Sequence, residues 1–286
     1  MSFESDFIVK PGSKVDLDKI DPGNTGKIKN KTQGKEKLAE QLGRITLLQN
    51  LVHQSPSRAW LAVVQAPNTG GKDGSINTIG KAMNLQGTRS VGFKEPSKTE
   101  LAHDFLWRAH MAAPAKGEFV FFNRSYYEDV LIVRVHNLVP KDVWKKRYGQ
   151  INDFEAMLHE NGTRTLKFYL HIDHDEQFKR LKDRWNDALK RGKLAKADFV
   201  EHLEWEKSKK AAQDTLSKCS TKYAPWFVIP ANNKWFAHYV MARIIADRLE
   251  SENLKPPKSP SDLEGIGQKF FGPGGPESVR HILVPK

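Results

Sequence analysis

A glycine-rich turn between an apolar run and a helical pattern constrains the fold of this chain more than any other feature. Residues 60–64 have the length and apolar composition of a buried strand, and residues 76–83 have helical spacing. Gly70, Gly71 and Lys72 lie between them. A strand, a glycine turn, a lysine and a helix in this order are typical of a phosphate-binding loop, because glycine lets backbone N–H groups converge on phosphate oxygens. A plain strand-to-helix turn is the alternative.

This loop departs from the usual phosphate-loop pattern at two positions. Ala66 stands where the first glycine is expected. Asp73 follows Lys72, where a serine or threonine normally binds magnesium. Even with these departures, the motif favours a phosphate site over a plain turn.

The net charge indicates a polyanionic partner. The 286 residues include 46 Lys and Arg against 34 Asp and Glu, which gives a formal charge of +12. Nucleic acid, a phosphate polymer, nucleotides or an acidic membrane surface would all fit this charge. Cys219 is the only cysteine, so no internal disulfide is possible and a reducing compartment is expected. The N-terminus lacks a signal-peptide pattern and no apolar run approaches the ~20 residues of a membrane helix, so we expect a soluble cytoplasmic protein.

The sequence divides into three segments. Residues 1–34 are polar, are interrupted by proline and glycine, and carry several lysines, so we expect an extended basic arm. Residues 35–250 carry successive strand and helix patterns, which predict one large domain. Residues 251–286 are rich in proline and glycine with little periodicity, and we expect them to form an appended C-terminal tail.

The strands and helices of the domain follow from its apolar spacing. Further strands are expected at residues 88–93, 117–122, 165–172 and 226–230. Helices are expected at residues 36–52, 98–111, 151–161 and 236–249. Ser97 and Glu100 have the spacing of a capping box at the start of the second of these helices. Asp104 and Arg108 share one face of it, which leaves a structural salt bridge and a substrate contact open.

A group of polar residues follows the apolar strand at 117–122. The group is Asn123-Arg-Ser-Tyr-Tyr-Glu-Asp129. Ligands bind at the carboxyl ends of the strands in open α/β sheets. An apolar strand followed at once by charged residues is hard to explain as core, so a functional role is favoured here.

A charged helical segment separates the last two strands. It covers residues 175–218 and is broken at Arg191-Gly-Lys193. Such an insertion is similar to the mobile lid of a nucleotide kinase. A surface helical hairpin is the alternative, and its charges would suit that as well.

Several spaced motifs together resemble the second family of polyphosphate kinases, in the subgroup that acts on nucleoside mono- and diphosphates. The resemblance covers about residues 35–250. Its motifs are Gly71-Lys-Asp-Gly74, Phe93-Lys-Glu-Pro-Ser97, His103-Asp104, Leu106-Trp-Arg108, Phe122-Asn-Arg-Ser-Tyr-Tyr-Glu-Asp129, Arg134-Val-His136, Gln150-Ile-Asn152 and Ala224-Pro-Trp-Phe-Val-Ile-Pro-Ala231. The resemblance implies an α/β, P-loop kinase-like parallel sheet flanked by helices, with an inserted helical lid. It also implies Mg²⁺-dependent phosphate transfer between inorganic polyphosphate and adenine or other purine nucleotides, in a homo-oligomer (a dimer or tetramer).

Two departures from the family pattern bear on activity. The family has an aspartate in the phosphate loop where this chain has Asn68, and the resemblance implies that this aspartate helps to hold magnesium and position the acceptor phosphate. Asparagine keeps the shape but loses the charge, which typically costs on the order of 10²–10⁴ in rate for a positioned group of this kind. In the predicted lid, His202 stands where the family usually has arginine.

The resemblance and the loop pattern together assign site residues. Asn68, Lys72 and Arg124 form the predicted catalytic set, with Arg124 stabilising charge on the transferred phosphoryl group. The expected phosphate or polyphosphate ligands are Gly70, Gly71, Lys72, Asp73, Gly74, Ser75, Lys94, Arg108, Asn123, Arg124 and Arg134. Asn123 would occupy the Walker-B-like position, and a structural ion pair is the alternative for Arg134. Asn68, Asp73 and Glu128 are the expected Mg²⁺ ligands, directly or through water.

Three other classes of function are alternatives to a polyphosphate-dependent kinase. A weakly active or inactive member that binds polyphosphate or nucleotide is supported by Asn68 and the altered lid. An ATP-dependent kinase of the same fold is disfavoured by Asp73. A nucleic-acid binder would explain the charge, but its recognition modules are absent from the sequence.

Overall fold

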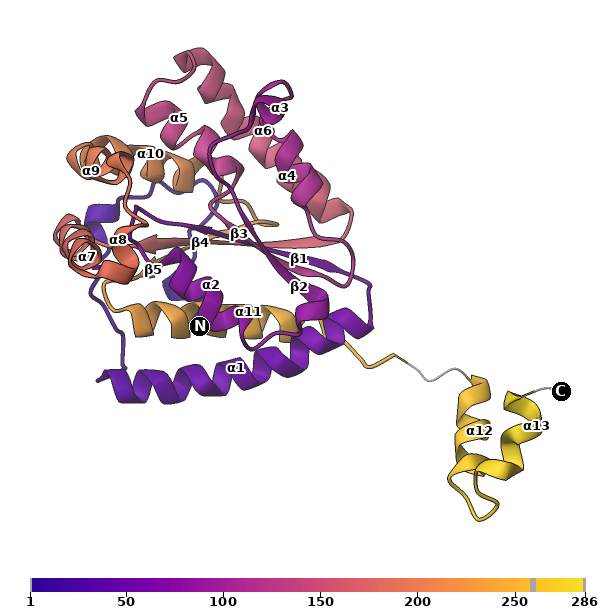
Figure 1. The fold of residues 1–286 in the computed structure, drawn as a ribbon. Coiled ribbons are helices and arrows are strands. Elements are labelled where there is room, and N and C mark those ends of the chain that lie inside the picture. Colours follow the sequence, from indigo (N-terminus) through magenta and orange to yellow (C-terminus); the bar gives the residue numbers. More distant parts are fainter. Residues whose placement is uncertain (1, 258–260, 285–286) are drawn as a thin grey trace. The chain divides into compact units, whose positions relative to one another are not determined.

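The fold is built on a parallel five-stranded sheet. The computed structural model describes residues 2–257 and 261–284. Its strands lie in the order β2-β3-β1-β4-β5, and every neighbouring pair is parallel (Figure 1). Their bounds are β1 (Ala59–Gln65), β2 (Thr88–Gly92), β3 (Phe119–Asn123), β4 (Thr163–His171) and β5 (Trp226–Pro230). The α/β fold with a parallel sheet, expected from the sequence, is confirmed.

Alternate side chains of the strands enter two separate cores. Trp60, Ala62 and Val64 of β1 pack on one face of the sheet, and Leu61 and Val63 pack on the other. Successive side chains of a strand point to opposite faces, so a strand that is buried on both faces must be apolar throughout. This explains why β1, β3 and β5 appear in the sequence as nearly continuous apolar runs, whereas β2, at the edge of the sheet, is only partly buried and more polar.

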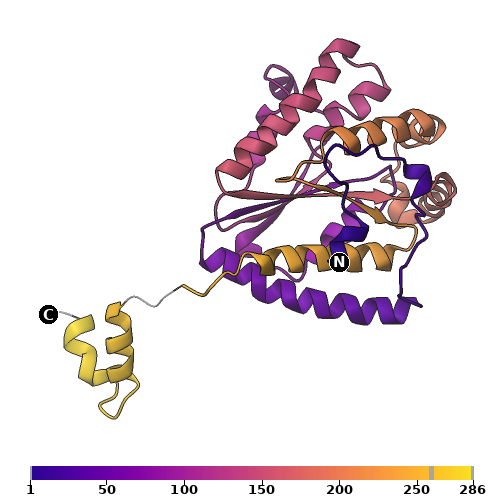
Figure 2. The same ribbon diagram turned by 180° about the vertical axis from the view of Figure 1, so that it is seen from behind.

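Helices cover both faces of the sheet. One face carries α1 (Lys31–Gln54), α2 (Lys72–Gly80) and α11 (Lys234–Ser251), with α1 and α11 lying side by side (Figures 1 and 2). The other face carries α6 (Lys141–Glu160) and α10 (Trp205–Lys218), together with the short helices α4 (Trp107–Ala112) and α5 (Ile132–Val135).

The prediction of a single helix at residues 98–111 is wrong. The structure has α3 (Lys98–Leu101), a break, and then α4. The predicted capping box is confirmed, since Ser97 and Glu100 exchange hydrogen bonds of 2.7 and 3.2 Å. Asp104 accepts from the backbone N–H of Leu106 at 2.9 Å, a local bond that competes with the helix, while Arg108 donates to the carbonyl of Lys94.

A helical insertion lies between β4 and β5. It consists of α7 (His174–Asn186), α8 (Ala188–Arg191), α9 (Lys196–Leu203) and α10. The break predicted at residues 191–193 falls between α8 and α9. α10 buries Ala211, Ala212 and Leu216 in the core, so this part of the insertion is integral to the domain.

Residues 2–30 pack on the domain. Ile8 forms an antiparallel bridge with Phe227 at the edge of β5. Two short 3₁₀ segments, η1 (Phe3–Asp6) and η2 (Leu17–Lys19), interrupt the otherwise extended backbone. Val9 and Leu17 are buried in the core, with 7% and 1% exposure. These apolar side chains, spaced through a polar segment, explain why the arm is not simply solvated as its lysines suggested.

Residues 255–286 form a separate compact unit, in place of the featureless tail expected from residue 251. It contains α12 (Ser261–Phe270), η5 (Pro276–Val279) and α13 (Arg280–Leu283). Leu263, Ile266 and Phe270 recur at helical spacing in α12, a signal that the proline and glycine content obscured. Residues 258–260 and 285–286 of the predicted tail lie outside the described residues. No helix among the described residues is long and apolar enough to cross a membrane.

A fully buried ion pair joins the sheet to α6. Lys167 of β4 contacts Glu155 of α6 at 2.5 Å, and both side chains are fully buried. The hydroxyls of Tyr126 and Tyr127 each donate to Glu155 at 2.8 Å. Lys167 also donates to the carbonyl of Cys219, at the end of α10. The network therefore connects β4, α6 and the end of α10 to the segment that follows β3.

Breaking this pair by Lys167→Met should lower the free energy of unfolding by about 3–5 kcal/mol, because an uncompensated buried carboxylate remains. The double variant Lys167→Met/Glu155→Gln should lose much less, since the amide oxygen still accepts from the tyrosine hydroxyls while the buried charge is gone. Urea unfolding measures both, with the exposed Lys146→Met on α6 as control. Equal losses in the single and double variants would contradict the assigned cause.

Candidate functional site

The phosphate loop lies between β1 and α2, at the carboxyl edge of the sheet. Gly71 is the N-cap of α2 with φ 105°, a left-handed conformation that favours glycine. A Cβ on Gly70 would lie 2.5 Å from the Ala66 Cβ and 2.8 Å from the Pro67 oxygen. Both glycines are therefore required by the backbone path, and the backbone N–H groups at the start of α2 remain without intrahelical partners.

Lys72 turns back over the loop that precedes it. Its ammonium group donates to the carbonyl of Ala66 at 2.9 Å and to that of Pro67 at 3.4 Å. The side chain is buried with 8% exposure. Burial, together with the nearby positive charge of Arg124, lowers the pKa of Lys72 to about 8. An anion beside Lys72 would favour its charged form and so counteract both effects, which makes phosphate oxygens suitable partners for it.

Arg124 places its guanidinium group against the phosphate loop. It follows β3 with φ 62°, an uncommon value for a residue other than glycine. Its backbone N–H donates to the carbonyl of Val64 at 3.1 Å. The side chain donates to the Oδ1 of Asn68 at 3.0 Å. The structure thus brings together all three residues of the predicted catalytic set, Asn68, Lys72 and Arg124.

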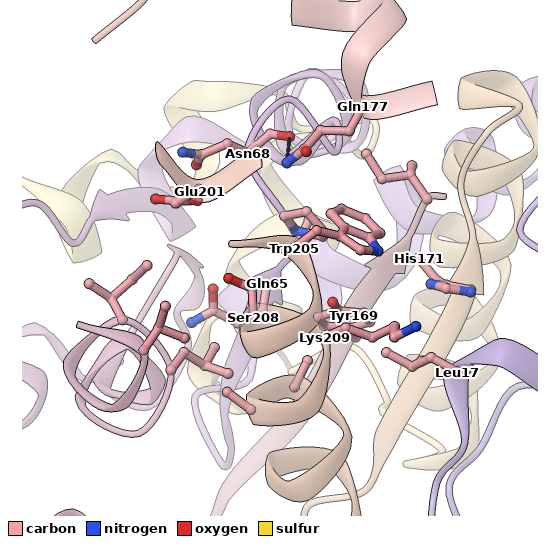
Figure 3. A pocket seen from close by; sticks show the side chains of 18 of the residues that line it. Leu17, Gln65, Asn68, Tyr169, His171, Gln177, Glu201, Trp205, Ser208 and Lys209 are labelled. Atoms are coloured by element: carbon pink, nitrogen blue, oxygen red, sulfur yellow. Dashed lines mark hydrogen bonds between the residues drawn. The ribbon is translucent and has the colours of Figure 1, made fainter. Parts of the chain in front are cut away.

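A pocket opens beside this set (Figure 3). Asn68, Arg124, Glu128 and Glu201 line its polar end. Away from them the lining becomes largely apolar, with side chains from α5, the end of β4, α10 and the N-terminal arm, namely Leu17, Leu131, Ile132, Val135, Tyr169 and Trp205. A polar end next to an apolar body suits a ligand with an anionic group on an apolar or aromatic part.

Comparison with known proteins identifies the family. The family model described as Polyphosphate kinase 2 matches residues 28–257. This chain belongs to that family. The AMP/ADP-polyphosphate phosphotransferase of Meiothermus ruber is 41% identical over 91% of this chain and 98% of its own length. The ADP-polyphosphate phosphotransferase of Rhodopseudomonas palustris is 39% identical over 88% of this chain and 92% of its own.

A solved structure agrees with this assignment. The crystal structure of Polyphosphate Kinase 2 from Arthrobacter aurescens superposes with a TM-score of 0.86. It is 37% identical in sequence, over 90% of this chain and 94% of that one. The sheet, the flanking helices and their order are therefore those of the polyphosphate kinase 2 family.

The sequence did not single out three side chains of the insertion that reach the phosphate loop or the pocket. Arg180 of α7 is almost fully buried and donates to the carbonyl of Thr69 at 3.2 Å and to that of Ala231 at 2.6 Å. Gln177 donates to the carbonyl of Asn68 at 3.4 Å. Glu201 of α9 lines the pocket. Their helical spacing indicates only a helix, so nothing in the pattern distinguished them from solvated neighbours.

His202 of α9 is the other departure from the family pattern, and its side chain contacts α7. Its Nδ1 lies 2.8 Å from the Oε1 of Gln177, and its ring stacks on that of His174 at 4.0 Å between centroids. Arginine at this position would carry a permanent charge, whereas burial and the nearby His174 lower the pKa of His202. His202 therefore supports α7 rather than supplying charge to the site.

The side chains expected to bind Mg²⁺ come from two elements. Asp73, in the first turn of α2, accepts from the amide of Asn123 at 2.7 Å. Glu128 lines the pocket near Arg124, while the oxygen of Asn68 is already bonded to that arginine. Among the residues that the structure describes, no three His, Cys, Asp or Glu side chains cluster as a metal site. Mg²⁺ usually binds one or two carboxylates and takes its remaining oxygens from water and substrate phosphates, so this donor set fits it.

The other predicted phosphate ligands lie in two different settings. Lys94 and Arg108 line one small hollow, where the Arg108 guanidinium donates to the carbonyl of Lys94 at 2.8 Å. Arg134 instead pairs with Asp214 at 2.7 Å and with the hydroxyl of Tyr148 at 3.1 Å. For Arg134 the structure therefore shows the ion pair that was the alternative.

Glu201→Gln should raise the melting temperature of the unliganded protein at about pH 8 and change it little at about pH 5. Burial, and to a smaller extent Glu128, raises the pKa of Glu201 to about 7 from an ordinary value of 4.5. The folded state therefore binds the proton more tightly, and this carboxylate is destabilising above pH 7, an effect that fades as the pH falls toward 4.5. Thermal unfolding across this range tests the prediction, with the exposed Glu40→Gln on α1 as control. A rise that is equal at both pH values would contradict it.

Proposed function

We propose that this chain transfers a phosphoryl group from inorganic polyphosphate to AMP or ADP. The observation that carries the proposal is that Arg124 and Asn68 line one end of a pocket whose body is largely apolar, with the buried Lys72 of the glycine loop near Arg124. The names of the relatives from Meiothermus ruber and Rhodopseudomonas palustris point to the same substrates.

The acceptor nucleotide fits the pocket with its phosphate at the polar end. There Arg124 presents a planar fork that matches phosphate oxygens. The nucleoside then lies along the apolar lining, where Trp205 and Tyr169 offer aromatic surface. Polyphosphate approaches the same centre from outside the pocket, and Lys94 and Arg108 are candidates to bind its chain.

The reaction requires positioning and charge neutralisation more than covalent chemistry from the protein. An oxygen of the acceptor phosphate attacks the terminal phosphorus of polyphosphate. The bond from that phosphorus to its bridging oxygen breaks, and the shortened polyphosphate leaves with the electron pair. Lys72 and Arg124 stabilise the negative charge on the transferred group. Mg²⁺, held by Asp73 and Glu128, would neutralise further phosphate charge.

A second candidate function is a binding protein with little or no turnover. The favouring observation is Asn68, which supplies a neutral amide where the family resemblance implies a carboxylate. Its oxygen is engaged by Arg124, so it brings no negative charge to the site.

Lys72→Met should reduce transfer from polyphosphate to AMP or ADP by on the order of 10²–10³, the usual loss when one donor to developing charge is removed. The measurement is a coupled assay with polyphosphate, Mg²⁺ and either acceptor. The exposed Lys145→Met on α6 is the matched control and should retain full activity. Activity of Lys72→Met within a few-fold of the natural chain would exclude the phosphate-loop assignment.

Asn68→Asp should raise kcat at least about tenfold without tightening substrate binding, because a carboxylate improves metal placement and activation of the attacking oxygen. It would still accept the bond from Arg124 that Asn68 accepts at 3.0 Å. Steady-state kinetics with AMP and with ADP measure the change. Asn161→Asp adds the same charge at the end of α6, before β4 and away from the carboxyl edge of the sheet, and should leave kcat unchanged. An Asn68→Asp variant that is no faster would show that the amide does not limit the reaction.

A further inference from the structure

The N-terminal arm runs along one face of α10. The backbone N–H of Val15 donates to the Oγ of Ser217 at 2.9 Å, and that of Leu17 donates to the Oε1 of Gln213 at 2.8 Å. Lys209 completes the row by donating to the Oδ1 of Asp18 at 2.8 Å. The three α10 residues are spaced four apart, so each turn of the helix holds one point of the arm.

The arm is then fixed to the carboxyl edge of the sheet. His171, the last residue of β4, donates from Nε2 to the carbonyl of Ile20 at 3.0 Å. The backbone N–H of Asn232, just after β5, donates to the carbonyl of Pro22 at 3.0 Å. Residues 15–22 of the arm are therefore bonded to the domain at five successive points.

Leu17 is the arm residue that lines the pocket. It is only 1% exposed and lies near Tyr169, His171 and Lys209, away from Asn68 and Glu201 (Figure 3). The match to the polyphosphate kinase 2 family begins at residue 28. This wall of the pocket is therefore built by a segment outside the part that the family model describes.

The charges around Leu17 are compensated. The Lys209 ammonium contacts Asp18 at 2.8 Å and Glu206 at 3.0 Å. Burial lowers the pKa of His171, so its ring is neutral near pH 7. An anionic group gains little here, because Lys209 is already paired with carboxylates and Arg124 lies at the other end of the pocket. The chemistry at this end fits an uncharged, partly aromatic group.

We propose that Leu17 of the arm forms a wall of the pocket that contacts the nucleoside of the acceptor, and that this side chain sets the affinity for it. This rests on the proposed function for the identity of the acceptor. The arm thereby makes the pocket selective for a nucleotide over a bare phosphate compound, since tripolyphosphate has no part that would touch Leu17.

Calorimetric titration of the full chain with AMP, and separately with tripolyphosphate, tests this inference. Leu17→Ala should bind AMP at least about tenfold more weakly, the effect of removing a few carbon atoms from a ligand contact. Its affinity for tripolyphosphate should stay within twofold. Val15→Ala is the matched control, because Val15 is also a buried arm residue but does not line the pocket, and both its affinities should stay within twofold. Unchanged AMP affinity in Leu17→Ala, or an equal loss for both ligands, would overturn the proposal.

Hydrogen exchange on the unmodified chain gives a second measurement that does not depend on how the variants fold. Saturating AMP should slow exchange of the amides in residues 15–20, and tripolyphosphate should not. No slowing with AMP, or failure of the chain to bind AMP, would overturn the inference. A phosphate-transfer assay on the same samples separates the two proposals. A chain that binds AMP through Leu17 but transfers no phosphate contradicts only the reaction, whereas normal transfer with unchanged AMP affinity in Leu17→Ala contradicts only the role of the arm.

Discussion

The geometry of the site centres on a buried cation, Lys72, that lies near a second cation, Arg124, at the carboxyl edge of the sheet. Burial, and to a smaller extent the charge of Arg124, lowers the pKa of Lys72, and the carboxylates of Glu128 and Glu201 offset this only in part. A polyanionic substrate removes the repulsion by supplying the missing negative charge. Under the proposed function, the site would be less stable without its ligand than with it, as is common where binding energy is reserved for charge that appears during a reaction.

The scaffold that holds these charges is stiff because it is buried on every side. Parallel strands bring the phosphate loop after β1 and Arg124 after β3 to the same edge, through the Val64–Asn123 pairing of the sheet. Behind Arg124, the buried pair of Lys167 and Glu155 fixes the two tyrosines that follow it. A cation held in this way loses little conformational freedom when it binds phosphate.

Segments distant in the sequence complete the pocket around this scaffold. Arg180 and Gln177 of the insertion donate hydrogen bonds to carbonyls of the phosphate loop, and Glu201 lines the polar end of the pocket. The N-terminal arm closes the opposite side through Leu17. α10 of the insertion contacts the arm at successive turns, so the two segments that complete the pocket are bonded to each other. The pocket is thus shaped by two segments at once, one inserted between strands and one preceding the domain.

The sequence by itself determined the five strands, the glycine loop with Lys72, and the charged residues that follow β3, because apolar period and backbone requirements are local properties. Local spacing could not reveal that the helix expected at residues 98–111 breaks, since a competing bond from Asp104 decides it. Nor could it distinguish Arg134, which pairs with Asp214, from Arg124, which faces the loop. Only the tertiary structure placed Arg180, Glu201 and Leu17 at the site, because their roles come from contacts between segments separated by more than 50 residues, and such contacts leave no periodic trace in the chain.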